Sequence, residues 1–438
     1  MTKPTTAFKL KQIANILGPG LLFASSAIGT SHLVLSTRAG AHHGMIFIWV
    51  ILGALLLKYP FFEFGPRYAN ATGHSLLKAY RQQGIWVVLL FLLVVFINMF
   101  AVTGAIGAVS AGLLATMMGL GHIPMPLLVG GVLGLTTLVL LIGRYPALDN
   151  FIKFISVVLL VTVFTAFFAV LFKGPLTPVE GFEPNANILD GAGLVLMISL
   201  IGWMPAGIEA STMTSIWAVE KMNSSHYRPT LKEALFDFNL GYIFTTVLAL
   251  MFLTIGAFTV YGSGELLDGN ATQFSNKLLK VFTSNLGQWS YWVIALAAFG
   301  TIYGTLITVM DAFTRSFIRG IQVLKFAKIE NDDTQKRFLE RNYNIFLPVI
   351  ALGGFLLFYF SAASMLKVLE MATITAFLTA PIIAVLNLRA IQSDAVPVTH
   401  RPSKLMLGLA YLGLVAMLAF SVYYLLDLFV YRGGIPTG

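Results

Sequence analysis

The segment Gly29-Thr30-Ser31-His32 interrupts a hydrophobic run that extends from about Ile13 to Thr37. A second run, from about Ile188 to Val219, is interrupted by Gly202-Trp203-Met204-Pro205-Ala206-Gly207. A helix that unwinds in lipid leaves backbone N–H and C=O groups unpaired, at a cost of several kcal/mol each. Such breaks persist only where the freed groups line a protected cavity, and matching breaks in two halves of a chain indicate a transporter's substrate site.

The composition is that of an integral membrane protein. Hydrophobic residues make up 57% of the 438 positions and charged residues only 11%, whereas soluble domains carry about 25% charge. The chain contains no cysteine, which excludes disulfides and thiolate metal sites. It also contains no Walker lysine motif. We therefore expect no cofactor, no enzyme activity and no nucleic-acid partner, despite the net charge of +9.

Eleven apolar runs are long enough to cross a bilayer. Their approximate limits are 13–37, 44–66, 85–114, 126–143, 151–172, 188–219, 236–261, 289–318, 343–362, 365–388 and 405–430. With the N-terminus in the cytoplasm, 21 of the 28 Lys and Arg residues fall on the cytoplasmic side and 6 outside, with Lys58 within a span. The positive-inside rule therefore predicts a cytoplasmic N-terminus and an outer C-terminus, in a bacterial inner membrane. The stretches 174–187 and 262–287 become outer loops.

The order of the spans suggests an internal repeat. Spans one to five and six to ten form two halves, 1–173 and 188–390, each of which opens with a broken helix. Because five is odd, the second half inserts upside down relative to the first. The expected fold is thus an all-α membrane protein with a LeuT-type 5+5 inverted repeat, and the eleventh helix at 405–430 is peripheral.

Several short motifs resemble those of the Nramp divalent-metal transporters. They are Gly18-Pro19-Gly20-Leu21-Leu22, Ile48-Trp49-Val50-Ile51-Leu52, Ala71-Thr72-Gly73-His74-Ser75-Leu76, Gly143-Arg144-Tyr145 and Met204-Pro205. The likeness covers roughly spans one to six. It implies eleven or twelve helices, proton-coupled import and alternating access.

The chain departs from that family at the residues that bind the metal. Where the family has Asp-Pro-Gly-Asn, this sequence reads Gly29, Thr30, Ser31 and His32, and the family's Met-Pro-His becomes Met204-Pro205-Ala206. A divalent ion would lose its charge-compensating carboxylate, which hard cations require. We therefore predict no transition-metal site.

The replaced site offers other chemistry around the two breaks. Hydroxyl groups surround the first, where a half-helix beginning near Ser31 would present free N–H groups to an anion. Glu209, inside a span, could bind a substrate amine, ligate a cation or carry the coupling proton; the alternative is a packing pair with Lys58 or His32. His32 could bind a carboxylate, relay protons or lie in an outer vestibule. The predicted substrate-binding residues are Ser25, Ser26, Gly29, Thr30, Ser31, His32, Met204, Ala206, Gly207 and Glu209.

A second set of polar residues suggests a coupling-ion site. Thr301, Thr305 and Thr308 share one helical face that leads to Asp311. Together with Glu209, the residues Thr305, Thr308 and Asp311 could hold Na⁺ or H⁺. The alternative is that Asp311 caps a bend before Arg315.

The sequence thus predicts a secondary transporter of a small polar solute, organic or zwitterionic, coupled to H⁺ or Na⁺. The alternative is a proton-coupled divalent cation transporter that uses Glu209, Met204 and carbonyl groups, for which Mg²⁺ is the better candidate than Mn²⁺ or Fe²⁺ because it needs few protein ligands.

Overall fold

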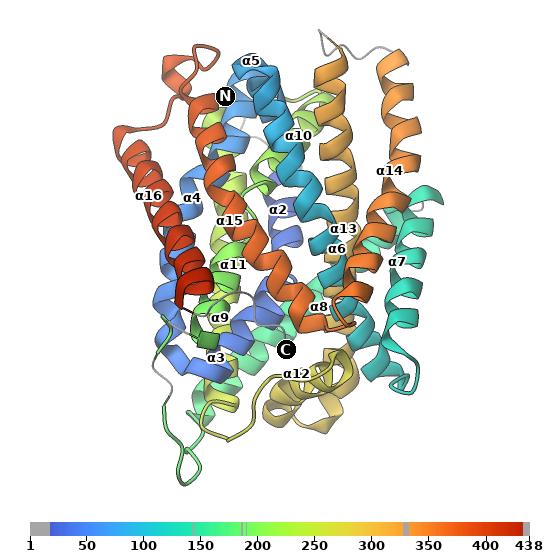
Figure 1. Ribbon diagram of the computed structural model, residues 1–438, viewed down its shortest axis with the longest axis vertical. Coiled ribbons are helices and arrows are strands. Elements are labelled where there is room, and N and C mark those ends of the chain that lie inside the picture. The colour runs from blue at the N-terminus through green and yellow to red at the C-terminus, as the bar shows by residue number, and fades with distance from the viewer. Residues whose placement is uncertain (1–17, 143–144, 185–186, 190, 327–332, 432–438) are drawn as a thin grey trace, which may run out of the picture.

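The computed structural model describes residues 18–142, 145–184, 187–189, 191–326 and 333–431, and the regular elements in these ranges are helices (Figure 1). Eight helical segments of this part of the chain are long and apolar enough to cross a membrane. The chain is therefore an integral membrane protein of almost entirely helical structure. The predicted number of eleven spans stays a prediction, because the first and sixth are divided by breaks and the fifth is described as apolar only over Val157–Lys173.

The first five predicted spans correspond to a broken helix followed by four continuous ones. Their elements are α2 (Pro19–Ala27), the π-helix η1 (Ser31–Ser36), α3 (Thr37–His43), the 3-10 turn η2 (Gly44–Ile46), α4 (Phe47–Thr72), α5 (Leu76–Gln83), α6 (Ile85–Met118), α7 (Met125–Ile142) and α8 (Tyr145–Lys173). The first span therefore continues past the predicted limit at Thr37 to His43.

The second half again opens with a broken helix, and one further helix follows it. Its elements are α9 (Gly191–Trp203), α10 (Ala210–Ser225), α11 (Leu231–Thr259), α12 (Ala271–Leu286), η3 (Gln288–Ser290), α13 (Tyr291–Lys325), α14 (Asp333–Phe360), α15 (Met365–Ile391), η4 (Val398–His400), α16 (Lys404–Leu426) and η5 (Asp427–Tyr431). The boundaries 1–173, 188–390 and 405–430 of the two halves and the peripheral helix stay a prediction.

Both breaks overlap the predicted positions and differ from them by one or two residues at each end. The first covers Ile28 to Thr30, and His32 belongs to the π-helix that follows it. The Ser36 hydroxyl at the end of this π-helix donates to the carbonyl of Ser31 at its start. The second break covers 204–209, because α9 continues through Gly202 to Trp203.

A carboxylate from the second half holds the start of the first broken helix. Asp237 on α11 accepts hydrogen bonds from the backbone N–H groups of Gly18, at 3.1 Å, and Gly20, at 2.6 Å. Gly18 is the N-cap residue of α2 and Gly20 lies in its first turn, so neither N–H group has a partner within the helix. Gly20 is also required sterically, since a Cβ atom there would lie 2.1 Å from the carbonyl oxygen of Asp237. The contact fixes α2 against α11.

The two ends of the bundle are marked by short helices, with α5 at one end and α12 at the other (Figure 1). The α12 helix corrects the expectation of a loop over 262–287. Asn270 accepts from the N–H of Gln273, whose side chain accepts in turn from the N–H of Asn270, and this capping box starts the helix. The charge bias predicts that the α5 end faces the cytoplasm.

Candidate functional site

The first break is pressed against α13. Gly29 is the residue of closest approach, since a Cβ atom at this position would lie 2.5 Å from Thr305 Oγ1. The same hydroxyl lies 3.5 Å from the carbonyl oxygen of Ile28 and donates to Thr301 O at 3.0 Å. The structure therefore brings the first broken helix and the predicted threonine face together.

The second break is bound by a lysine from α4. Lys58 is buried, and its Nζ donates to the carbonyl oxygens of Ile201 at 2.9 Å, Gly202 at 3.1 Å and Ala206 at 2.8 Å. The last carbonyls of a helix have no partner within it, and a cation at this end is favoured by the helix dipole. Lys58 therefore satisfies the end of α9 and one carbonyl of the unwound segment.

A cavity of about 70 Å³ lies between the two breaks. Space for one water needs about 10–15 Å³ on this scale, so the cavity can hold a small solute. Its lining consists of Ser26, Ala27, Thr30, Ser31, Val102, Ile106, Trp203, Pro205, Ala206, Gly207, Glu209, Ala210, Met213, Trp217, Thr305, Thr308, Val309, Ala312 and Phe313. Met213 and Trp217 lie on α10, which runs from the break toward the α5 end (Figure 1), and both line the cavity.

Two polar atoms at this cavity have no hydrogen-bond partner in the described part of the chain. They are Oε2 of Glu209 and Oγ1 of Thr30, and both side chains are buried. Glu209 lies against the backbone of the break, since a Cβ atom on Gly207 would lie 2.5 Å from Glu209 Oε1. A buried polar group without a partner is costly, so these two atoms mark where a polar group of a ligand could bind.

Eight of the predicted site residues line the cavity. They are Ser26, Thr30, Ser31, Ala206, Gly207, Glu209, Thr305 and Thr308. Gly29, Ser25 and Met204 do not line the cavity. Gly29 is packed against Thr305, Ser25 is exposed, and the side chain of Met204 is fully buried. The predicted free N–H groups after the first break are absent at His32 and Leu33, since both donate to Gly29 O.

His32 and Asp311 also lie outside the cavity lining, and each has partners of its own. His32 is buried, so it does not lie in an outer vestibule; its Nε2 donates to Thr245 O at 3.0 Å and its Nδ1 is 2.8 Å from Ser31 Oγ. Asp311 accepts from Arg315 at 2.7 Å and from Tyr343 at 2.7 Å. Asp311 therefore forms an ion pair with Arg315 within α13, a pairing that was not among the predictions for this residue.

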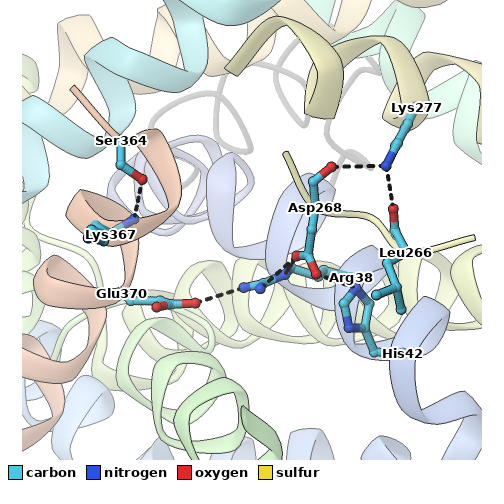
Figure 2. Close-up of polar contacts among 8 residues, drawn as sticks. All are labelled: Arg38, His42, Leu266, Asp268, Lys277, Ser364, Lys367 and Glu370. Carbon is cyan, nitrogen blue, oxygen red and sulfur yellow. Dashed lines mark hydrogen bonds and ion pairs between the residues drawn. The ribbon is translucent and has the colours of Figure 1, made fainter. Parts of the chain in front are cut away.

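The α12 end of the bundle is closed by ion pairs between segments far apart in the sequence (Figure 2). Arg38 on α3 lies 2.8 Å from Asp268, in the loop before α12, and 3.0 Å from Glu370 on α15. Lys277 on α12 donates to the backbone carbonyls of Leu266 and Asp268, which fixes that loop. These contacts join α3, α12 and α15 on the side of the breaks away from the α5 end.

Sequence and structure comparisons agree on the class of protein. The family described as Natural resistance-associated macrophage protein-like (Nramp) matches residues 20–427. An uncharacterized Pasteurella multocida protein, PM0681, is 33% identical over 415 residues, which cover 93% of this chain and 91% of that protein.

Solved structures show the same fold at low identity. A mutant of the Eremococcus coleocola manganese transporter superposes with a TM-score of 0.69 at 13% identity, over 100% of this chain and 92% of that one. Mhp1, a nucleobase-cation-symport-1 family transporter in a closed conformation with bromovinylhydantoin bound, gives 0.57 at 14% identity, over 95% and 92%. Both are LeuT-fold transporters, which confirms the predicted fold class. The chain therefore belongs to the Nramp family, whose members are transporters and not enzymes.

Proposed function

We propose that this secondary transporter moves a small polar organic solute that carries an amino group or is zwitterionic. The substrate is not a transition metal, and the coupling ion is H⁺ or Na⁺. The observation that carries the proposal is the buried carboxylate of Glu209. This residue lines the cavity, and its Oε2 has no partner among the described residues. An ammonium group of a solute would satisfy its charge and its hydrogen-bonding capacity together.

The rest of the lining supports an organic solute. Most of it is apolar or aromatic, with Trp203, Trp217 and Phe313 among its large side chains, and a few hydroxyls such as Thr30 are interspersed. Sites for small organic molecules have this composition, in which apolar walls bury the ligand and a few polar groups orient it.

The same lining offers little to a transition metal. Met204 does not line the cavity, and the Ala206 carbonyl already accepts from the Lys58 ammonium. Within the described ranges no group of three or more His, Asp or Glu side chains could hold a metal ion.

A divalent cation, in particular Mg²⁺, is the second candidate. Its support is the likeness to a structure described as a manganese transporter, together with the one carboxylate at the cavity. Mg²⁺ keeps several waters when it binds, so a site with one carboxylate and hydroxyls could accept it partly hydrated.

Thermal unfolding of the purified protein in the presence of a ligand panel tests the proposal. The panel contains neutral amino acids, primary amines with their N-trimethyl analogues, monocarboxylates, Mg²⁺ and Mn²⁺. A ligand that binds the folded state raises the melting temperature. We expect a shift with a primary amine or amino acid that is lost in Glu209→Gln; a shift with Mn²⁺ alone would overturn the proposal.

A further inference from the structure

The proposed function gives Lys58 no role in solute binding or in ion coupling. Its ammonium group has three N–H donors, and these meet three carbonyl oxygens, of Ile201, Gly202 and Ala206. Two acceptors belong to the end of α9 and the third to the unwound segment, so one side chain from α4 bridges the break. The ring of Phe62 lies 5.6 Å from Nζ and adds a cation–π contact.

The acceptors fit the protonated lysine and not the neutral one. A neutral amine has two N–H donors and a lone pair, so it cannot donate to three carbonyls. At least one carbonyl oxygen would then face the lone pair and be repelled. Ala206 lines the cavity, so the break could respond to the loss of this proton next to the proposed solute site.

The charged surroundings of Lys58 also point to proton binding. Glu209, at the end of the break, is the carboxylate that attracts the Lys58 ammonium among the residues that the structure describes. Tyr242 on α11 is engaged elsewhere, since its hydroxyl donates to Leu55 O at 2.6 Å. Glu209 borders the cavity, and it therefore offers a route by which a proton could pass between Lys58 and cavity water.

We propose that Lys58 is a proton-binding site. In its charged form it holds the backbone of the α9–α10 break in the conformation described, and in its neutral form it lets this backbone move. The released proton passes to Glu209 or to cavity water, and Lys58 remains as the neutral amine. The inference rests on the proposed function only in taking the chain to be ion-coupled. It makes H⁺ the coupling ion and places its site on Lys58 of α4, a residue that the sequence suggested only as a packing partner of Glu209.

Amide hydrogen exchange over residues 198–210 tests this without any substrate. The samples are the full-length protein, Lys58→Arg, which keeps its charge, and Lys58→Met, which has none; Lys280→Met on the exposed face of α12 is the control. Rates are corrected for the intrinsic effect of pH. We expect Lys58→Arg to be protected at every pH and Lys58→Met to exchange at least about tenfold faster, as expected for lost buried hydrogen bonds.

The unmodified protein should follow Lys58→Arg at low pH and approach Lys58→Met as the pH rises. In Glu209→Gln this transition should move to lower pH, since the carboxylate that attracts the proton is gone. Protection that follows Lys58→Arg over the whole pH range would overturn the proposal, as would a transition that persists in Lys58→Arg. Neither result depends on the ligand panel, so a failed proposal here and a failed solute assignment are distinguishable.

Discussion

The Nζ atom of Lys58 lies 2.8 Å from the carbonyl oxygen of Ala206, so α4 is tied to the unwound backbone that lines the cavity. In most helices the last carbonyls are satisfied by caps or water. Here the buried ammonium of Lys58 satisfies the last carbonyls of α9, inside a broken membrane-spanning segment. The consequence is that any change at the second break must also involve Lys58.

The carboxylate of Glu209 is expected to serve function at the expense of stability. Glu209→Gln removes a buried charge whose Oε2 has no partner in the described structure, and an unpaired buried polar group costs about 1–3 kcal/mol. The variant should therefore melt at the same temperature as the unmodified protein or higher, while amine binding is lost. A marked loss of thermal stability would instead show that Glu209 has a structural role.

The contact between Gly29 and α13 predicts a steric effect with a matched control. Gly29→Ala places a Cβ atom 2.5 Å from Thr305 Oγ1, whereas Gly53→Ala on α4 meets nothing within 4 Å. We expect Gly29→Ala to lower the melting temperature and Gly53→Ala to leave it unchanged. Thr305→Ala in the Gly29→Ala background should restore part of the loss, because it removes the hydroxyl; no restoration would contradict the observed packing.

The cap on α2 predicts a loss of stability that depends on the oxygen acceptors. Asp237→Ala leaves the N–H groups of Gly18 and Gly20 without their acceptor. Hydrogen bonds to a charged group contribute about 1.5–3 kcal/mol, so we expect a destabilisation of that order. Asp237→Asn keeps one acceptor and should fall between the two. Equal stability of all three proteins in thermal unfolding would show that the cap contributes nothing.

The ion pairs at the α12 end predict a change in accessibility. Arg38→Gln removes the links to Asp268 and Glu370, so the cavity should open more often toward this end. Because the chain has no cysteine, a single Thr308→Cys substitution gives a clean reporter in the cavity. A membrane-impermeant thiol reagent added at the α12 end should label it severalfold faster with Arg38→Gln than with the control Lys280→Gln. Identical rates would show that these pairs do not close the cavity.

Much of the fold could be predicted from the sequence because membrane helices leave strong signals. Long apolar runs and the two polar interruptions locate the broken helices, and eight of the predicted site residues line the cavity. The limits of the breaks could not be predicted, because they depend on a distant residue. Lys58 donates to carbonyl groups near the end of α9 at Trp203, and it lies 143 residues before Ile201 in the sequence.

Contacts between distant segments also explain the residues that the sequence analysis missed. Asp237 lies in an ordinary apolar run, and only the fold brings it to Gly18 and Gly20. The partners of Arg38 likewise come from two remote segments. By contrast, the capping box of Asn270 and Gln273 is local and could have revealed α12.

Uptake into proteoliposomes shows whether the cavity at the two breaks serves an organic solute. Radiolabelled amino acids and amines, Mg²⁺ and Mn²⁺ are compared in the same vesicles under an inward proton gradient, with Glu209→Gln as the paired variant. The account predicts saturable accumulation of an amino-group-bearing solute that Glu209→Gln abolishes, with no Mn²⁺ signal. Saturable Mn²⁺ uptake, without accumulation of any organic solute, would contradict it.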